Sequence, residues 1–552
     1  PVSQSGVTVT AAIATGGGTL GGTATATTTS SGTATFTNLS ISGTVGDRTL
    51  SFATTGLTSV TSNAVTITAG PAAQLAFTVQ PSSTTAGTII SPAVRVTVQD
   101  ASGNKVTSFP GGRPTVTVAI GNNPGGDTLS GDKSNLTGTG TLAGIATFNS
   151  LSIAHVGEGY TLTAAMAGVT GTESSAFNVT PRAAKLLVFT VQPSAASAGA
   201  TITPAVQVTA RDSLGNTATS FAGTVTVAIG TNPGGGALSG TTGPSAVNGV
   251  ATFADLSIDK AGAGYTLTAA ATGLTGGNST AFAISAGAAT KLVLTTQPSS
   301  SAQSGVALAQ QPVVQIQDAN GNPVSQNGTV VTATIASGPA GATLSGATAT
   351  TGTNGAATFS GLTIAGPTGS YMLSFGTTGL TAITSGTITL DAGGPTQLTI
   401  TTQPAASAQS GVAFAQQPVV QLRDASGNAV SQAQVTVTAA IATGGGTLGG
   451  TLTATTNGSG AASFTNLAIT GTAGDRTLTF SATGLTAVTS GTITITAGAA
   501  TQLALTTQPS SSAQSGVAFA QQPVIQVRDA SGNAVSQSEV TVTAAIATGG
   551  GT

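Results

Sequence analysis

The only histidine of the chain, His155 in the segment SIAHVGEGY, is the first candidate for acid–base or metal chemistry. A serine–histidine–aspartate triad or a zinc site needs several partners, and one imidazole supplies only one of them. Segments that match this one elsewhere in the chain, such as SIDKAGAGY, have no histidine. We therefore predict that His155 is a strand-end residue at a loop, with no catalytic or ligand role.

A second candidate is the aspartate of the pattern D-x-x-G-N, which occurs five times, at Asp100, Asp212, Asp318, Asp424 and Asp529. Calcium takes six to eight oxygen ligands, whereas each copy offers one carboxylate without a D-x-D-x-D spacing. Aspartate also accepts hydrogen bonds from the backbone two residues on, and Gly followed by Asn tolerates turn conformations. The pattern predicts a turn between two strands.

Two further pairs of carboxylates could do chemistry. Asp127 and Asp132 flank TLSG, and a weak cation site there stays open. Asp255 and Asp259, in ADLSIDK, share one face of a strand, and paired carboxylates can act as acid and base. Lys260 lies beside them and no aromatic floor for a sugar is near, so we predict a solvated edge.

The glycine-rich stretches ATGGGTLGG and TNPGGGALSG lack the Lys-Ser/Thr that follows a phosphate-binding loop, and they predict turns between strands. We therefore expect no catalytic residue, no cofactor-binding residue and no metal ligand. Tyr160, Tyr265 and Tyr371 share one position, and Arg48 and Arg476 take that position in other copies. They are predicted to act structurally, like the tyrosine corner that bonds backbone upstream.

Composition excludes other classes of function. Charged residues make up 5% of the 552 residues and the net charge is −2, so no basic patch could neutralise phosphates of a nucleic acid. We expect no membrane-spanning segment, because no apolar run approaches 18 residues. With no cysteine, there is no disulfide framework. The first residue is Pro, so we expect a processed chain or a window of a longer one.

The elements that position these residues repeat with a period of about 105 residues. After a short apolar strand, the dipeptide Gln-Pro recurs with prolines at Pro81, Pro193, Pro298, Pro404 and Pro509, which are 112, 105, 106 and 105 residues apart. The D-x-x-G-N aspartates and a third marker keep this spacing. The third marker is a phenylalanine, at Phe36, Phe148, Phe253, Phe359 and Phe464.

Each repeat reads as all-β. In the repeat that ends near residue 497, the segments QLTITTQ, PVVQLRD, QVTVTAAIA, ASFTNLAIT, RTLTFSATG and TITIT alternate apolar and polar residues. Period-two alternation between Gly, Asn and Ser turns is the signal of a strand. About seven short strands in about 105 residues favour an immunoglobulin-like sandwich. We predict an all-β tandem array of immunoglobulin-like β-sandwich domains, with no helices of note.

The markers divide the chain into six parts. Whole domains are predicted at residues 71–181, 182–286, 287–391 and 392–497, and partial domains at 1–70 (the C-terminal part of a repeat) and 498–552 (the N-terminal part). Pro1 to Thr19 and Ala534 to Thr552 are nearly identical. We expect a fibre in which Thr19 and Thr552 of neighbouring copies hold equivalent places, or in which a strand at Val535–Ile546 acts as Val2–Ile13 does.

The segments VQIQDANGNPV, VVTATIASGPAGATLSG and TNGAATFSGLTI combine a D-A-x-G-N turn, a glycine-rich turn before Thr-Leu and N-G-x-A-x-F. This combination resembles the bacterial Ig-like repeats of invasin- and intimin-type surface proteins, and it extends over essentially the whole chain. The resemblance implies β-sandwiches that serve as an extracellular spacer or adhesive stalk.

We therefore predict a structural protein that is extracellular or at the cell surface and is not an enzyme. Low charge leaves little repulsion between copies, which favours a self-associating fibre whose partner is the chain itself. A stalk that presents an adhesive tip is the alternative, and a spacer within a secreted enzyme is a third possibility. A host or surface ligand stays open.

Overall fold

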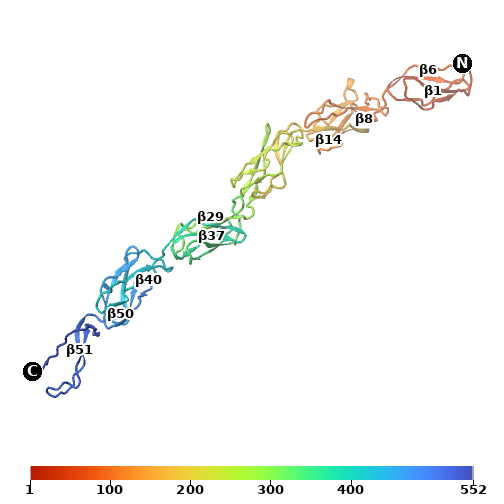
Figure 1. The fold of residues 1–552 in the computed structure, drawn as a ribbon. Coiled ribbons are helices and arrows are strands. Elements are labelled where there is room, and N and C mark those ends of the chain that lie inside the picture. The colour runs from red at the N-terminus through yellow and green to blue at the C-terminus, as the bar shows by residue number, and fades with distance from the viewer. Residues whose placement is uncertain (1, 550–552) are drawn as a thin grey trace. The chain divides into compact units, whose positions relative to one another are not determined.

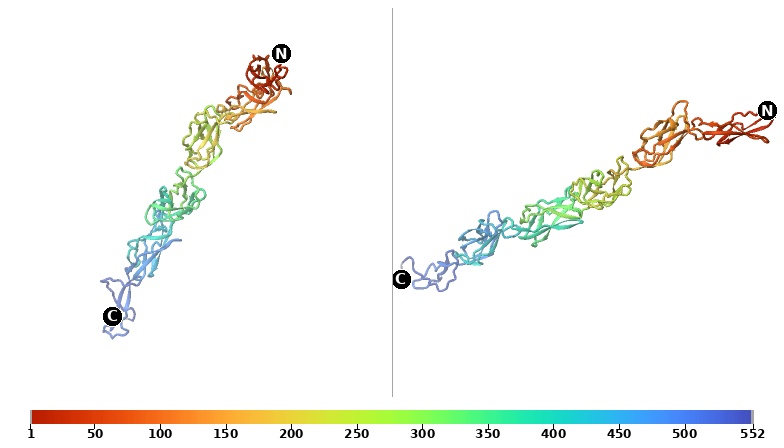
Figure 2. Two further views of the ribbon diagram at one scale, coloured as in Figure 1. Left: turned by 90° about the vertical axis from the view of Figure 1, so that its right-hand side faces the viewer. Right: turned by 90° about the horizontal axis from the view of Figure 1, so that it is seen from above.

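The structure is a computed structural model that describes residues 2–549. It comprises two units, Pro1–Ser285 and Ala286–Thr552. Strands make up both units, and the one helical element of the described residues is the short 3-10 turn η1, at Gly140–Leu142. The predicted all-β fold of tandem immunoglobulin-like sandwiches is confirmed (Figure 1), and Figure 2 shows the same strands from two further sides.

The first unit contains three sets of strands. Residues 1–70 contain β1 (Thr8–Thr15), β2 (Thr19–Gly21), β3 (Thr25–Thr27), β4 (Ser40–Ser42), β5 (Gly46–Ala53), β6 (Val60–Thr61) and β7 (Val65–Ile67). The next set is β8 (Gln74–Val79), β9 (Thr84–Thr85), β10 (Val94–Gln99), β11 (Thr115–Ile120), β12 (Ser134–Leu136), β13 (Ile145–Phe148), β14 (Gly157–Tyr160), β15 (Leu162–Met166), β16 (Val169–Glu173) and β17 (Phe177–Thr180). The third set is β18 (Leu186–Val191), β19 (Ala196–Ser197), β20 (Val206–Arg211), β21 (Thr226–Ile229), β22 (Leu238–Ser239), β23 (Val250–Phe253), β24 (Ser257–Ile258), β25 (Gly262–Tyr265), β26 (Leu267–Ala270), β27 (Gly277–Asn278) and β28 (Phe282–Ser285).

The second unit continues the pattern. Its first set is β29 (Lys291–Thr296), β30 (Ser301–Gln303), β31 (Val313–Gln317), β32 (Val330–Ser337), β33 (Thr343–Ser345), β34 (Thr348–Thr350), β35 (Ala356–Thr358), β36 (Thr363–Ala365), β37 (Gly369–Thr377), β38 (Leu380–Thr384) and β39 (Ile388–Asp391). The second set is β40 (Gln397–Thr402), β41 (Ser407–Gln409), β42 (Val419–Arg423), β43 (Thr436–Thr443), β44 (Thr447–Gly449), β45 (Thr453–Thr455), β46 (Ala461–Ser463), β47 (Ala468–Thr470), β48 (Gly474–Ser481), β49 (Val488–Thr489) and β50 (Ile493–Thr496), and β51 (Ala500–Thr507) and β52 (Val524–Asp529) follow.

The set β40–β50 shows how one sandwich is built. One sheet has the order β40–β42–β46, and the other has the order β41–β50–β48–β43–β45. The first strand changes sheets at Gln403-Pro404, where the buried proline has no N–H to offer to the first sheet. The short strand β41 then joins the second sheet and runs parallel to β50.

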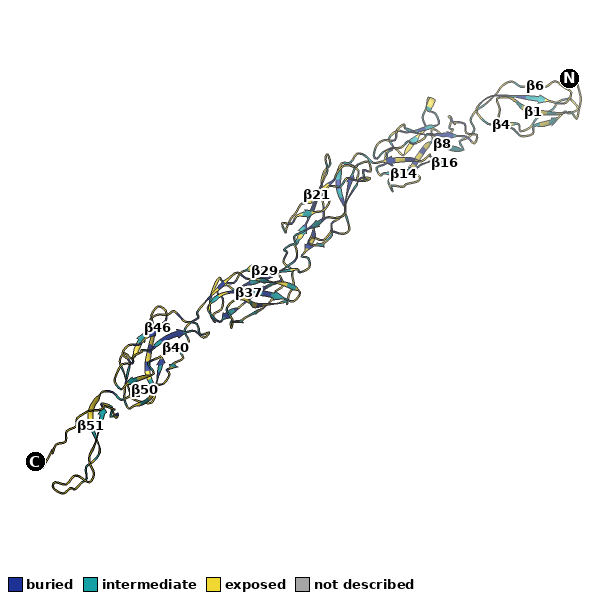
Figure 3. Ribbon diagram, in the orientation of Figure 1, coloured by how far each residue is buried: buried dark blue, intermediate teal, exposed yellow. Residues whose placement is uncertain are grey.

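A separate hydrophobic core fills each of four sandwiches. In the set β40–β50 the alternating residues predicted to face inward are buried, among them Val420, Leu422, Phe464, Leu478 and Phe480. Equivalent cores lie within residues 75–179, 187–284 and 292–390. Dark blue segments mark these buried stretches in Figure 3. Because one face of each strand is buried, the period-two pattern fixes which residues face outward.

The structure corrects two expectations about strands. ASFTNLAIT forms two strands, β46 and β47, because Asn466 takes a left-handed turn at φ 58° between them. Residues 540–549 form no strand, because the equivalent β43 pairs with β45 and β48, and residues 498–549 contain no counterpart of either. The expected equivalence of Thr19 and Thr552 in neighbouring copies stays a prediction, and Thr552 lies outside the described residues.

Candidate functional site

Each D-x-x-G-N segment forms a buried turn whose aspartate also holds the incoming linker. Asp424 Oδ1 accepts the N–H of Asn428 at 2.8 Å, and Asp424 Oδ2 accepts the Asn428 side-chain amide at 2.8 Å and the N–H of Gly393 at 2.8 Å. The other four aspartates accept the matching linker N–H groups, of Gly70, Arg182, Gly287 and Gly498. The predicted turn is present, but it also fastens each linker.

Within the turn, only the glycine takes a left-handed conformation, for example Gly427 at φ 82°. The expectation that the following asparagine also serves backbone tolerance is therefore wrong. The asparagine side chain instead contacts the preceding repeat. Asn428 Nδ2 donates to Gly366 O at 2.9 Å, and Asn428 Oδ1 accepts from the N–H of Thr368 at 3.0 Å.

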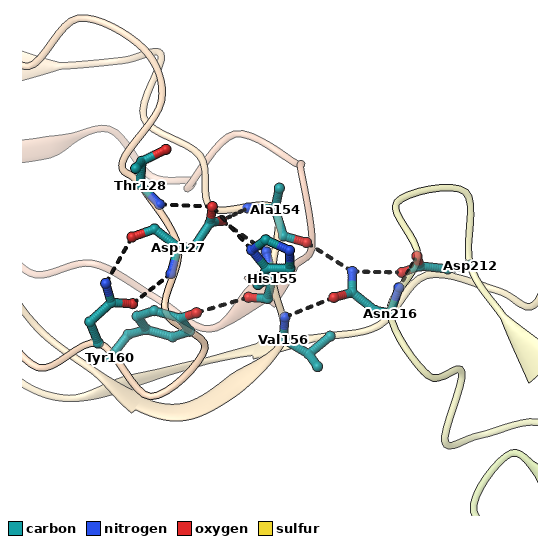
Figure 4. A network of polar contacts seen from close by, with 9 residues as sticks. Asp127, Thr128, Ala154, His155, Val156, Tyr160, Asp212 and Asn216 are labelled. Atoms are coloured by element: carbon teal, nitrogen blue, oxygen red, sulfur yellow. Dashed lines mark hydrogen bonds and ion pairs between the residues drawn. The ribbon is translucent and has the colours of Figure 1, made fainter. Parts of the chain in front are cut away.

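The same two bonds recur at three other asparagines. Asn533 bonds Gly471 O and Ala473 N, and within the first unit Asn104 bonds Gly43 O and Val45 N. Asn216 bonds Ala154 O at 2.8 Å and Val156 N at 3.2 Å (Figure 4). One asparagine carboxamide thus donates to a backbone C=O and accepts the backbone N–H two residues further on, as a neighbouring strand would. We call this arrangement the Asp–Asn joint. It consists of the aspartate, the linker N–H that the aspartate accepts, and the asparagine with its two backbone partners.

Each asparagine bonds the first and third residues of a three-residue backbone segment, and the predicted corner residues bond the carbonyl of the middle residue. Tyr371 Oη donates to Pro367 O at 2.7 Å, between Gly366 and Thr368. Tyr160 Oη donates to His155 O at 3.0 Å in the same way (Figure 4). Where arginine replaces tyrosine, Arg476 Nη2 donates to Thr472 O at 2.6 Å and Arg48 Nη2 donates to Thr44 O at 2.5 Å.

The corner side chains are buried: Tyr371 is fully buried and Arg476 is 5% exposed. The core of one repeat therefore presents a fixed backbone segment to the turn of the next. Sequence comparison identified the corner position but not its link to the Asp–Asn joint, because the two partners lie about 60 residues apart. The 105-residue spacing shared by the two markers was the signal that could have connected them.

The glycine-rich turns are seats for these corner side chains. A Cβ placed on Gly444 would lie 2.5 Å from Arg476 Cδ, and one placed on Gly236 would lie 2.9 Å from Tyr265 Oη. Gly445, in the middle of the same GGG run, has open space around its missing Cβ. The predicted turns are therefore present, and part of each run is glycine because a corner residue occupies the space.

Each joint also has contacts that depend on the repeat. In the second unit, Ser304 Oγ lies 2.9 Å from Ser426 Oγ, and Ser410 Oγ lies 3.1 Å from Ser531 Oγ. Between the second and third sets of the first unit, Arg182 Nε instead donates to Ala86 O at 2.7 Å. These pairs differ between the two sequence subtypes, whereas the aspartate and asparagine bonds stay the same.

The electrostatics of the joint favour an ionised aspartate. Burial alone raises the pKa of the Asp424 carboxyl, but bonds from the Asn428 side chain and from the N–H groups of Gly393 and Asn428 outweigh it and leave the pKa lowered. The pKa values of Asp100, Asp212, Asp318 and Asp529 are lowered for the same reasons. Hydrogen bonds to the charged form stabilise it without a cation.

The structure accounts for His155 and Asp127 as parts of one loop. Asp127 accepts the N–H groups of Thr128, Ala154 and His155, and its Oδ1 lies 3.2 Å from His155 Nδ1 (Figure 4). These bonds hold the segment that Asn216 grips. His155 is thus a loop residue as predicted, and the carboxylate of Asp127 faces backbone donors.

The carboxylates of Asp255 and Asp259 also accept backbone N–H groups. Asp255 accepts the N–H and hydroxyl of Thr241, and Asp259 accepts the N–H of Ala237 at 2.7 Å. Asp132 donates its N–H to Ser150 Oγ. Within residues 2–549, no group of three or more His, Cys, Asp or Glu residues is placed to hold a metal ion. The arrangement of these side chains suits the fixing of loops.

Comparison with known proteins gives one family match. The family model of Ig-like domain 6 of SMCHD1 matches residues 287–392 and again residues 393–497. No curated protein sequence matches the chain. In the described part of the chain, no helix has the length and apolar character needed to cross a membrane.

Among solved structures, the Escherichia coli adhesin FdeC has 17% sequence identity and a TM-score of 0.30, over 59% of this chain and 100% of that one. Invasin, a bacterial integrin-binding protein, has 12% identity and a TM-score of 0.26, over 76% and 79% of the two chains. The Yersinia pseudotuberculosis adhesin InvE has 20% identity and a TM-score of 0.17, over 37% and 58%. The solved structures similar to this chain thus include bacterial adhesins.

Proposed function

We propose that this chain is a non-enzymatic structural array outside a bacterial cell, where it acts as a spacer that holds its repeats in series. The observation that carries the proposal is the Asp–Asn joint, which recurs with the same bonds at Asn104, Asn216, Asn428 and Asn533. A site that is copied once per repeat and faces the neighbouring repeat serves the array, whereas a catalytic site would need only one copy.

The joint has enough bonds to hold two repeats together. A net hydrogen bond contributes about 1 kcal/mol, and bonds to a charged group contribute about 1.5–3 kcal/mol. The two asparagine bonds and the linker N–H bond to the charged aspartate would then favour the docked arrangement by about 3.5–5 kcal/mol, or roughly 300- to 4,000-fold. The linkers add to this restraint, because only residues 392–396 separate β39 from β40.

The test removes the asparagine side chains from the full chain. Asn104→Ala, Asn216→Ala, Asn428→Ala and Asn533→Ala are combined, and Asn63→Ala, at an exposed position, is the control. We expect the radius of gyration distribution from small-angle scattering to broaden in the fourfold variant while circular dichroism stays unchanged. An unchanged distribution would show that the joints do not restrain the repeats.

A second candidate function, a fibre that grows by self-association, is supported by the uncharged outer faces of the sheets. On β43 and β45 the outward residues Thr436 and Thr438 lie opposite Thr455 and Thr453, and all four are exposed. The corresponding faces of β1 with β3 and of β32 with β34 also carry exposed threonines. The strands β3, β34 and β45 lie at sheet edges. Edge strands of soluble proteins usually carry charged residues that prevent association, and these three strands carry none.

Sedimentation at increasing protein concentration tests the fibre. Because charge contributes little, we expect association that persists in high salt. Thr438→Lys with Thr453→Lys, together with the matching changes Thr332→Lys and Thr348→Lys, should weaken association, and Asn63→Lys should not. A chain that stays monomeric at all concentrations would exclude self-association and leave the spacer role intact.

A further inference from the structure

The two ends of each whole repeat are joined directly by a pair of parallel strands. In the repeat β29–β39, the short strand β30 pairs with the last strand β39, with Ser301, Ala302 and Gln303 opposite Thr389, Leu390 and Asp391. Additional backbone bonds extend this pair at both ends, from Thr389 N to Ser300 O and from Ser304 N to Asp391 O, each 2.9 Å. The side chain of Gln297 fastens the same region by accepting the N–H of Gly386 at 3.1 Å.

This geometry determines how a repeat responds to tension along the chain. Tension enters a repeat at β29, reaches the parallel pair near the start of β30 and leaves the repeat at the end of β39. Because these strands run parallel, the two pulls act in opposite directions along the strand axes. All the hydrogen bonds between them are then loaded together and must break almost at once. If the strands were antiparallel, the bonds would open one after another.

The first strand of the repeat, β29, does not carry this role alone. It pairs with β31 and, at Lys291, with β38, and both of these strands are internal to the repeat. The loss of β29 would therefore leave β30 and β39 holding the two ends together. The change of sheet at Gln297-Pro298 separates these two parts of the chain. The parallel pair is therefore the shortest path for force through the fold.

The length of the parallel pair differs between the two subtypes of repeat. The repeats β29–β39 and β40–β50 have three residue pairs, Ser407, Ala408 and Gln409 facing Thr494, Ile495 and Thr496 in the second. The repeats β8–β17 and β18–β28 have only two, Thr84 and Thr85 with Val179 and Thr180 in one, and Ala196 and Ser197 with Ile284 and Ser285 in the other.

The upstream bond of the repeat β8–β17 differs as well. In β29–β39 and β40–β50 the backbone carbonyls of Ser300 and Ala406 accept an N–H from the last strand at 2.9 Å. In β8–β17 the corresponding partner of Asn178 N is a side-chain hydroxyl, Ser83 Oγ. The longer subtype thus places more main-chain bonds in the path of the force.

We propose that the array has a graded mechanical function: under tension the repeats at residues 71–181 and 182–286 unfold first and lengthen the chain, while the repeats at 287–391 and 392–497 remain folded to higher force. The early repeats then act as extensible elements that limit the load on their neighbours. The proposal rests on the structural role given above, and it concerns strength within each repeat rather than the joints between repeats.

The test is to pull single full-length chains through tags added at both ends. Unfolding of a repeat releases about 105–110 residues, which at roughly 3.6 Å per residue, less a folded length of about 40 Å, gives about 350 Å. We expect two such steps at lower force and two at higher force. Four steps at a single force would overturn the proposal.

Matched proline substitutions then identify the responsible strands. Ala302→Pro, in β30, removes an N–H from the parallel pair, and Ala349→Pro, in β34, removes one from an edge strand outside the force path. Both variants should lose thermal stability, but only Ala302→Pro should move one step from the high-force group into the low-force group. Equal effects of the two on unfolding force would refute the assignment, since forced unfolding follows the unfolding barrier rather than overall stability.

A covalent lock keeps the question decidable if Ala302→Pro fails to fold. The chain has no cysteine, so Ala302→Cys with Leu390→Cys, which face each other, introduces a single disulfide. Oxidation should abolish one high-force step, and reduction should restore it. Loss of a low-force step instead would contradict the ranking. The scattering test of the joints is independent, because asparagine variants can separate repeats without changing the force at which each one unfolds.

Discussion

Replacing one joint aspartate by asparagine, Asp424→Asn, gives a sharp test of the Asp–Asn joint because the two side chains have nearly the same shape. Asp424 is 2% exposed and accepts hydrogen bonds at both oxygens. If the new amide group takes the place of Oδ2, it faces the N–H of Gly393 and the Asn428 amide. If it takes the place of Oδ1, it faces the N–H of Asn428. Neither orientation restores all acceptors.

The magnitude follows from the number of donors left without a partner. A buried donor without an acceptor costs about 1–3 kcal/mol, so one or two of them, with the loss of the charge, should cost about 3 kcal/mol. This corresponds to roughly 100-fold more frequent opening of the turn. The array unfolds in several steps, so an overall unfolding free energy is not well defined, and local opening is the better quantity.

Hydrogen exchange followed by mass spectrometry measures this opening in the full chain. Peptides that contain Gly393 and Asn428 should exchange roughly 100-fold faster in Asp424→Asn. Peptides around Gly498 and Asp529 should not change. The control is Asp475→Asn in the same repeat, since that exposed carboxylate accepts from Thr494 Oγ1 and an amide oxygen can replace it. Equal exchange in the two variants would refute the role assigned to Asp424.

Acid should open all the joints together, because their aspartates have lowered pKa values in the fold. The stability that these aspartates add is complete above about pH 4, the ordinary pKa of the side chain, and is lost as the pH falls through the lowered pKa. A pH series of the same exchange experiment would show this loss. Tyr371→Phe should leave Pro367 O without its hydrogen-bond donor and cost about 1 kcal/mol of stability. We expect faster hydrogen exchange at Thr368, and no change there would argue against the corner residue supporting the joint. Gly444→Ala should destabilise the repeat more than Gly445→Ala does, by about 1–3 kcal/mol of overpacking, and should therefore give the lower melting temperature. Both glycines have positive φ, but only a Cβ at Gly444 would meet Arg476. The reverse order would contradict the space assigned to Arg476. Chelators should leave the melting temperature unchanged, and a sharp fall would reveal a structural cation.

Sequence patterns alone were enough to predict the class of fold. Alternation in segments such as RTLTFSATG requires one buried face, and Leu478 and Phe480 are indeed fully buried in β48. The Gln-Pro and D-x-x-G-N markers also located turns correctly, because proline, glycine and aspartate act through their own backbone. Local chemistry of this kind can be read without knowing what lies nearby in space.

Alternation could not show where a strand stops. ASFTNLAIT keeps its pattern through Asn466, yet the chain turns there and its two halves join different sheets. Nor could it show that Ser301–Gln303, three residues with no apolar stripe, form the parallel link between the ends of a repeat. Both features depend on hydrogen-bond partners that lie far away in the sequence.

The Asp–Asn joint could not be predicted from the sequence, because its partners meet only in the folded chain. Asn428 looks like a turn residue, and its turn is local, but its side chain bonds the backbone at Gly366 and Thr368. Those partners have no side-chain signature, because an N–H and a C=O belong to every residue. The tyrosine that holds Pro367 between them is visible in the sequence, but its purpose is set by packing, which brings a buried corner of one repeat against the turn of the next.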